Sequence, residues 1–173
     1  MKIRNLVLFT VLAVLLAGTV FFTHYRAAAA DNSKKALTVS FKSLDGKTDV
    51  KLEDYRGKVV VIDVWATWCG YCIREMPELV AFDKEMTEKK RPVQLIGISV
   101  DRDKEAARAY AKKEKIAYPM AFGDEKSLKP FGSISGIPVK FIINKKGVIV
   151  DRIIGATDQA TLEKKIEKYV KEK

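Results

Sequence analysis

The hydrophobic pattern of the chain opens with one long apolar run. Residues 6–22 carry no charge, Lys2 and Arg4 precede them, and four alanines follow at positions 27–30. A basic start, an apolar segment and small residues after it are typical of a secretory signal peptide, and the 17 residues of the run also reach the lower limit for spanning a bilayer. We therefore expect residues 1–30 to be a signal peptide or an N-terminal membrane anchor with a short linker, and the remainder to lie outside the cytoplasm.

Beyond residue 30 the pattern alternates between strand-like and helix-like periods. Continuous apolar, β-branched runs predict strands that are buried on both faces, whereas apolar residues three and four apart predict helices. Asp45-Gly46 is a hairpin signal. We expect strands at residues 59–65, 93–100, 139–143 and 148–154, helices at residues 75–89, 104–115 and 159–171, and a loop-rich segment with one short helix at residues 118–138.

These elements follow one another as a β-hairpin and then β, α, β, α, β, β and α. A parallel βαβ core, an antiparallel strand pair and a closing helix predict a three-layer α/β domain with a mixed central sheet and an N-terminal β-hairpin. Residues 31–173 are 143 in number, which is enough for one hydrophobic core. We expect them to form a single domain and to be monomeric.

The chain has only two cysteines, Cys69 and Cys72, directly behind the first buried strand. A structural zinc site needs four ligands, and the only histidine, His24, lies in or beside the N-terminal apolar segment. A purely structural disulfide is an alternative, but so short a loop would stabilise the fold little. We therefore expect a reversible redox disulfide, with no metal and no other cofactor. The absence of histidine after residue 30 also excludes Ser-His-Asp and Cys-His catalysis.

If a helix begins at the cysteine motif, the two thiols differ in their environment and therefore in their role. Cys69 would lie beside unpaired backbone N–H groups and the positive end of the helix dipole, which lowers the pKa of a thiol. Cys69 would therefore attack a substrate disulfide, and Cys72, one turn later, would resolve the mixed disulfide. Between them, Gly70 allows close approach of a partner and Tyr71 adds a bulky side chain.

The net charge of +10 narrows the choice of partners only slightly. Lys2, Arg4 and Arg26 precede Asp31 and no acid does, so residues 31–173 hold 29 basic and 22 acidic residues, a net charge of +7. This excess is spread along the chain and is typical of a solvated surface. We expect no nucleic-acid partner for an exported chain.

Several motifs together resemble the thioredoxin superfamily. "VIDVWATWCGYC" is similar to its active-site strand and loop, Pro77 to the proline of its active-site helix, and "GIPVKFIINKKGVIVDRIIG" to its cis-proline segment. "CIREMP" resembles the C-x-x-E-x-P pattern of the exported, membrane-tethered TlpA/ResA-like branch. The similarity covers nearly all of residues 31–173, and it implies a thioredoxin-like fold.

The resemblance also implies roles for individual residues. Pro138 would be the cis-proline, and Ile137 before it would offer backbone groups to an extended substrate. Trp68 would flank the reactive sulfur. Glu75 matches the glutamate that is implicated in controlling cysteine acidity in the TlpA/ResA-like branch. Asp63 departs from the asparagine common in that branch and matches the buried acid of cytoplasmic thioredoxins, so it could relay a proton to or from Cys72.

By this resemblance the protein would be an extracytoplasmic thiol–disulfide oxidoreductase that reduces protein disulfides. Its client would be the Cys-x-x-Cys-His site of apocytochrome c, its electrons would come from a membrane thiol carrier, and residues 6–22 could anchor it to the membrane. The Gly-Tyr pair between the cysteines also occurs in exported DsbC-type isomerases, which leaves a disulfide isomerase or oxidant as an alternative. Those isomerases carry a separate dimerisation domain, for which this chain has no room.

Two further alternatives have less support from the sequence. The peroxiredoxin pattern places threonine three residues before the reactive cysteine, where this chain has Ala66. Copper-delivery chaperones of this fold use Cys-x-x-x-Cys with a distant histidine, whereas this chain has the shorter spacing and no histidine after His24.

Overall fold

The central strand is β3 (Val59–Trp65), and all seven of its residues are buried, as its β-branched run predicts. It pairs in parallel with β4 (Val93–Ser99) and antiparallel with β6 (Val139–Ile143). The computed structural model describes residues 36–172. The segment expected to be a signal peptide or anchor therefore lies outside the described residues. None of the helices between residues 36 and 172 combines the length and apolar character needed to cross a membrane.

The other strands extend the sheet on both sides of this centre. The seven strands follow the order β2-β1-β5-β4-β3-β6-β7. The pairs β3–β4 and β4–β5 are parallel and the others are antiparallel, so the sheet is mixed, as expected. The remaining strands are β1 (Ser40–Ser43), β2 (Asp49–Lys51), β5 (Met120–Phe122) and β7 (Ile149–Ile154).

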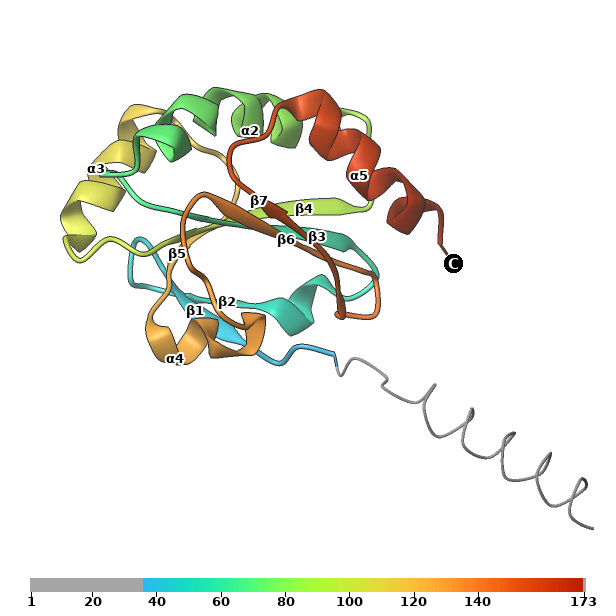
Figure 1. Cartoon of the computed structure of the whole chain (residues 1–173), viewed down its shortest axis with the longest axis horizontal. Coiled ribbons are helices and arrows are strands. Elements are labelled where there is room, and N and C mark those ends of the chain that lie inside the picture. The colour runs from blue at the N-terminus through green and yellow to red at the C-terminus, as the bar shows by residue number, and fades with distance from the viewer. Residues whose placement is uncertain (1–35, 173) are drawn as a thin grey trace, which may run out of the picture. The chain divides into compact units, whose positions relative to one another are not determined.

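Helices cover the two faces of the sheet unequally (Figure 1). One face carries the long helices α2 (Gly70–Glu88), α3 (Lys104–Lys113) and α5 (Gln159–Lys171). The other face carries only short ones, the helix α4 (Glu125–Leu128) and the 3-10 helices η1 (Leu52–Tyr55) and η2 (Lys129–Phe131). The predicted three layers are therefore present, with one thin layer.

Side chains of β3 alternate between two separate hydrophobic clusters. Val61 and Trp65 pack on the face covered by α2, whereas Ile62 and Val64 pack on the opposite face. Because successive side chains of a strand point to opposite faces, Asp63 lies on the α2 face. The strand therefore places a carboxyl group in the layer that also contains the active-site helix.

The predicted fold is confirmed, and one strand was missed. The segment 118–138, expected to be loops with one short helix, contains β5 as well as α4 and η2. β5 has only three residues, too few for a periodic pattern, and its parallel pairing with β4 is long-range. Elsewhere the agreement is close: α5 spans Gln159–Lys171, and the Asp158 side chain caps it by accepting the Thr161 N–H at 2.7 Å.

The packing of α5 gives a direct test of this arrangement. Ile166 is fully buried in the α2-face cluster, whereas Lys164 on the same helix is exposed. We expect Ile166→Ala to lower the free energy of unfolding by about 2–5 kcal/mol, because it removes buried methyl groups and leaves a cavity. Lys164→Ala, the control, should change it by less than about 0.5 kcal/mol. Guanidinium denaturation measures the free energy of unfolding of both variants. Equal decreases in the two variants would contradict the packing of α5 against the sheet.

Candidate active site

The two cysteines form a disulfide at the junction between β3 and α2. Their Cα atoms lie 5.3 Å apart. Cys69 is the N-cap of α2, and its Sγ accepts the backbone N–H of Cys72 at 3.2 Å. The helix therefore begins within the motif, as predicted, and its first N–H groups face the Cys69 sulfur. In the reduced protein the same contacts favour a thiolate at Cys69.

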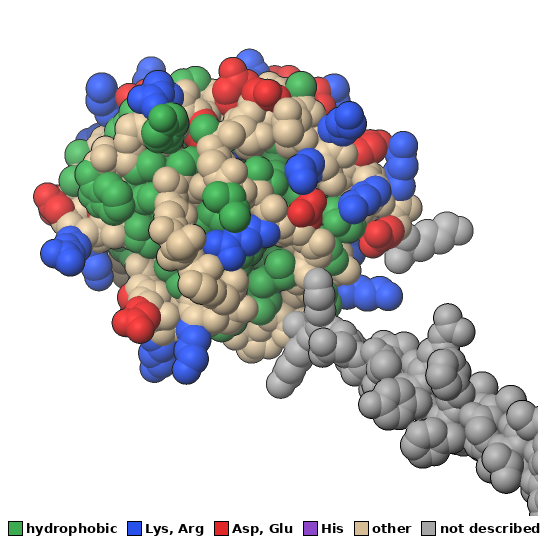
Figure 2. Space-filling view, viewed as in Figure 1, with side chains coloured by type: hydrophobic (Ala, Val, Ile, Leu, Met, Phe, Trp, Pro, Cys, Tyr) green, Lys and Arg blue, Asp and Glu red, His purple; other side chains and the backbone are tan. Residues whose placement is uncertain are grey.

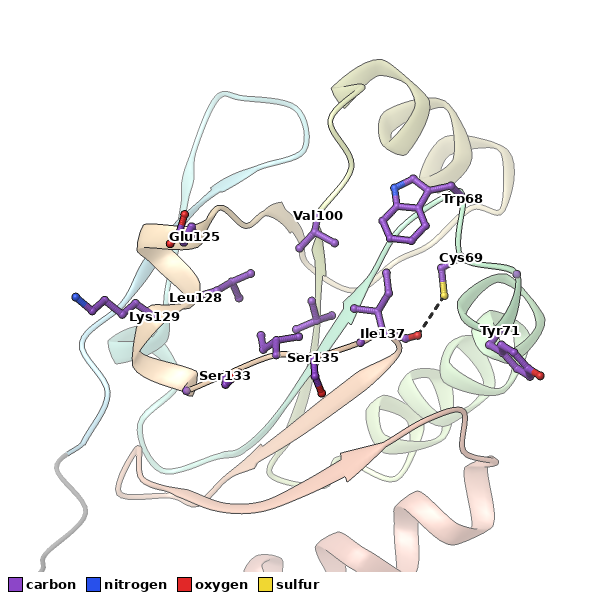
Figure 3. A pocket seen from close by; sticks show the side chains of 15 residues that line it. Trp68, Cys69, Tyr71, Val100, Glu125, Leu128, Lys129, Ser133, Ser135 and Ile137 are labelled. Atoms are coloured by element: carbon purple, nitrogen blue, oxygen red, sulfur yellow. Dashed lines mark hydrogen bonds between the residues drawn. The ribbon is translucent and has the colours of Figure 1, made fainter.

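The two sulfur-bearing residues differ in their access to the surface. Cys72 is fully buried, whereas Cys69 is 6% exposed. The Cys69 Sγ lies 3.7 Å from the carbonyl oxygen of Ile137 (Figure 3), and the Ile137–Pro138 peptide bond is cis, as expected. Only Cys69 therefore faces an incoming partner, and the backbone of Ile137 lies directly beside it.

A cavity of about 1050 Å³ opens beside the Cys69 sulfur. Figure 3 shows Trp68 and Cys69 on one side of it, Leu128 and Lys129 of the α4–η2 segment on the opposite side, and Ile137 between them. The lining is completed by Val64, Val100, Glu125 and residues 70–71 and 132–136. It is largely apolar, which suits an uncharged, extended protein segment.

The residues expected to bind substrate do not all face this cavity. Trp68 is 69% exposed at its rim. Tyr71 also contributes to the lining, but its ring points away from the other labelled side chains (Figure 3). The Arg74 guanidinium lies over this ring, 4.3 Å from its centroid. A Cβ atom at Gly70 would make only an ordinary contact with Arg74, so the fold itself does not require glycine there.

Hydrophobic side chains gather at the end of the molecule that contains this site. Figure 2 shows hydrophobic side chains gathered over the left part of the molecule, the end at which α2 begins in Figure 1, whereas acidic and basic side chains are interspersed on the right. Contiguous apolar surface on a soluble domain commonly marks a binding site.

Asp101 holds the loop before Cys69, a role that the sequence did not suggest. Its carboxylate accepts the Thr67 N–H at 3.1 Å, the Thr67 hydroxyl at 2.6 Å and the Ser99 hydroxyl at 2.8 Å. Asp103, and not Asp101, caps α3, because its carboxylate accepts the backbone N–H groups of Glu105 and Ala106. The carboxylate after β4 thus fixes the loop after β3, because the two parallel strands end side by side.

Behind the disulfide, three charged side chains meet in the interior. Asp63, Glu75 and Lys140 are 1%, 4% and 0% exposed. The Lys140 ammonium forms an ion pair with the Glu75 carboxylate and lies 3.6 Å from an oxygen of Asp63. Glu75 also accepts the Thr157 N–H at 2.9 Å. Lys140 was not among the predicted site residues; the signal for it was a lone charge within the apolar strand at 139–143.

Burial raises the pKa of both carboxyl groups. The pKa of Asp63 rises from 3.8 to about 7, because the loss of water around its carboxylate outweighs the attraction of Lys140, and the Glu75 charge adds to the rise. The pKa of Glu75 is also raised by burial, but Lys140 and the Thr157 N–H oppose the rise. Asp63 lies too far from Lys140 for a hydrogen bond, and its oxygens have no hydrogen-bond donor within residues 36–172.

Comparison with known proteins identifies this arrangement. Residues 33–152 match the model of the AhpC/TSA family. The chain belongs to this family. This family member is 31% identical to the thiol-disulfide oxidoreductase ResA of a Bacillus cereus strain, over 97% of its own length and 98% of the relative's. It is 27% identical to the thioredoxin-like protein YneN of Bacillus subtilis (strain 168), over 91% and 94% of the two lengths.

The fold comparison agrees with this assignment. A thiol:disulfide interchange protein of the thioredoxin family from Chlorobium tepidum TLS superimposes with a TM-score of 0.72 and 26% identity, over 82% of this chain and 99% of that one. The family member described here is therefore a thioredoxin-like thiol–disulfide oxidoreductase with a Cys69–Cys72 disulfide. Such enzymes act on protein thiols and disulfides.

The raised pKa of Asp63 predicts a stabilising substitution. The unfolded chain ionises at Asp63 near pH 3.8 and the folded protein near pH 7, so the folded state binds one more proton between these values. Stability from this group is therefore present below pH 3.8 and is lost as the pH rises towards 7. Asp63→Asn removes that loss and should raise the free energy of unfolding at pH 7 by roughly 2–4 kcal/mol.

The same substitution should have little effect near pH 4. Denaturant unfolding of the oxidised protein between pH 4 and pH 8 measures the difference. Asp49→Asn, at a partly exposed ion pair of β2, is the control and should show no comparable gain. If the increase in the free energy of unfolding of Asp63→Asn does not grow between pH 4 and pH 8, the raised pKa of Asp63 is contradicted.

Proposed function

We propose that this oxidoreductase is a reductase of extracytoplasmic protein disulfides, in which Cys69 is the nucleophile and Cys72 the resolving thiol. The observation that carries the proposal is the asymmetry of the two cysteines. Cys69 caps α2 at the edge of the apolar cavity, whereas Cys72 is sealed behind it. Only one of the two sulfurs can meet a disulfide on another protein.

The groove is suited to hold an extended client segment beside the sulfur. The carbonyl of Ile137 faces the Cys69 sulfur at 3.7 Å, and the cis peptide bond to Pro138 presents this backbone edge to the cavity. A client strand could hydrogen-bond to that edge while its apolar side chains contact Trp68 and Leu128. Gly70 leaves space above the disulfide for the client backbone.

The reaction proceeds through two exchanges. The Cys69 thiolate attacks the client disulfide, a mixed disulfide forms, and one client sulfur leaves as a thiolate. Cys72 then loses its proton to the Asp63 carboxylate and attacks the Cys69 sulfur, and the second client sulfur leaves as a thiolate. Two electrons pass from the enzyme dithiol to the client. Asp63 suits this proton transfer because it lies on the α2 face of the sheet and has a pKa of about 7.

The wider context of the reaction follows from the resemblance to the TlpA/ResA-like branch. Residues 1–30 would export the chain, and residues 6–22 would anchor it if they are not cleaved. The client would be a Cys-x-x-Cys-His segment of apocytochrome c, kept reduced for haem attachment. A membrane thiol carrier would return the enzyme to its dithiol form. The full-length similarity to ResA supports this assignment.

Trapping of the mixed disulfide tests the proposed roles of the cysteines. We expect Cys72→Ser to accumulate a covalent adduct with an oxidised Cys-x-x-Cys-His peptide, because the adduct cannot be resolved. Cys69→Ser should form none and should lose insulin-disulfide reduction. Mass spectrometry after acid quenching detects the adduct. An adduct on Cys72 in the Cys69→Ser variant, or insulin reduction without Cys69, would contradict the proposal.

The apolar groove predicts a second, independent effect. Trp68→Ala should raise KM for an oxidised peptide with apolar flanking residues by about tenfold, since a large aromatic contact of this kind is worth on the order of 1.4 kcal/mol. The rate with oxidised glutathione should change little, because that small disulfide does not fill the groove. Ile154→Ala removes an equally exposed apolar side chain outside the groove and is the control. The same loss for both substrates would argue against a client-binding groove.

A further inference from the structure

The end of β4 reaches both sides of the client groove. Val100, the residue after the strand, lines the groove, and Figure 3 shows its side chain between those of Leu128 and Trp68. The carbonyl oxygen of Ser99 accepts the Gly123 N–H at 2.8 Å. Gly123 in turn packs against Leu128, since a Cβ atom at this glycine would lie only 3.1 Å from a methyl carbon of that side chain. The main chain of β4 therefore holds the side of the groove that the α4–η2 segment forms.

The side chain of Asp101 holds the opposite side of the groove. Its carboxylate accepts the backbone N–H of Thr67 at 3.1 Å and the Thr67 hydroxyl at 2.6 Å. The Ser99 hydroxyl donates to the same carboxylate at 2.8 Å and accepts the Asp101 N–H at 3.1 Å, which fixes the direction of the carboxylate. Asp101 is 9% exposed and Ser99 is fully buried, so water competes little for these hydrogen bonds. A buried hydrogen-bond network therefore ends at Thr67, directly before Trp68.

Trp68 depends on its backbone because few atoms surround its ring. The side chain is 69% exposed at the rim of the groove, and a ring without close packing keeps its direction only as well as the backbone that carries it. After Trp68 the backbone is fixed by Cys69, which caps α2 and donates its N–H to the Ala66 carbonyl at 3.1 Å. Before Trp68 it is fixed by the hydrogen bonds between Thr67 and Asp101. Asp101 therefore supplies the constraint on the side of Trp68 that lies away from the helix.

We propose that Asp101 is a positioning residue for client binding, which holds the Trp68 ring at the rim of the groove through Thr67 and so sets the affinity for an extended apolar segment. The proposal rests on the proposed function, because it takes the groove as the site of the client. Asp101 itself does not line the groove that the described residues form. Its removal should therefore weaken the binding of a client and leave the chemistry at Cys69 in place.

Two substitutions of Asp101 separate the effect of its geometry from that of its charge. Alanine removes every side-chain hydrogen bond to Thr67. Asparagine keeps part of the network without a charge, since its amide oxygen accepts the Thr67 N–H and its NH2 group donates to a hydroxyl oxygen. We expect Asp101→Asn to behave like the unchanged protein and Asp101→Ala to lose the position of Trp68. If the charge acted on the Cys69 thiol instead, both substitutions would have the same effect.

Fluorine NMR of the oxidised protein, labelled with 5-fluorotryptophan, reports on Trp68 without any client. The chain has two tryptophans, and Trp65 is fully buried, so its signal serves as an internal reference. In Asp101→Ala the Trp68 signal should move towards its position in the unfolded protein, while the Trp65 signal stays. Asp103→Ala is the matched control, because Asp103 caps α3 through backbone N–H groups, and it should leave both signals in place.

Kinetics with the oxidised, apolar peptide then test the effect on a client. Asp101→Ala should raise KM by about three- to tenfold, the range for the loss of one or two hydrogen bonds, and leave kcat within about twofold. In the double variant Asp101→Ala/Trp68→Ala, KM should equal that of Trp68→Ala alone, since no ring is left to hold. Asp103→Ala should leave KM unchanged.

The proposal is overturned if the Trp68 signal stays in place in Asp101→Ala, if the increases in KM multiply in the double variant, or if kcat falls while KM stays. Equal effects of Asp101→Asn and Asp101→Ala would also overturn it. If Trp68→Ala alone leaves KM unchanged, the client groove of the proposed function is wrong and the proposal falls with it. The two failures are therefore told apart by the Trp68→Ala variant.

A substitution at Thr67 decides the question if Asp101→Ala does not fold. Thr67→Val keeps the shape of the side chain and the backbone N–H, and it removes only the hydroxyl bond to Asp101. It should move the Trp68 signal and KM in the same directions as Asp101→Ala, by smaller amounts. A Trp68 signal and a KM that both stay in place in Thr67→Val would contradict the proposal.

Discussion

The ion pair between Lys140 and Glu75 is the constraint around which the active site is arranged. Both groups are removed from water, and such a pair stays buried only if each charge keeps its partner. This fixes the face of α2 that meets the sheet and the register of β6 against β3. The ion pair also affects the protonation state of Asp63, because the Asp63 carboxyl group lies 3.6 Å from the same Lys140 ammonium. The position of the two cysteines at the start of α2 therefore depends on charges that no client touches.

The disulfide divides the site into an outer and an inner half. On the outer half, Cys69, Trp68 and the Ile137 backbone face the apolar groove. On the inner half, Cys72 packs in the hydrophobic cluster on the α2 face of the sheet, the face on which Asp63 also lies. We propose that exchange with a client takes place in the outer half, and that the proton of Cys72 is transferred in the inner half.

Much of this arrangement was predictable from the sequence, because short-range patterns determine it. The β-branched run 59–65, the helix 159–171 and the spacing of Cys69 and Cys72 each carry their own signal. The cis peptide bond before Pro138 followed from resemblance. What was missed depends on long-range contacts. The three residues of β5 form a strand because they pair with β4. Lysine is rarely buried, and Lys140 is buried here because it pairs with Glu75, which lies 65 positions away in the sequence.

The reduction potential of the Cys69–Cys72 couple tests the central claim, that this oxidoreductase works as a reductase, most directly. Equilibration with dithiothreitol or glutathione buffers at pH 7, followed by quantitative alkylation, gives the value. We predict a potential at the reducing end of the thioredoxin-like range, about −270 mV. A value towards about −120 mV would show that the disulfide form is the reactive one, and it would contradict a reductase in favour of an oxidant or isomerase.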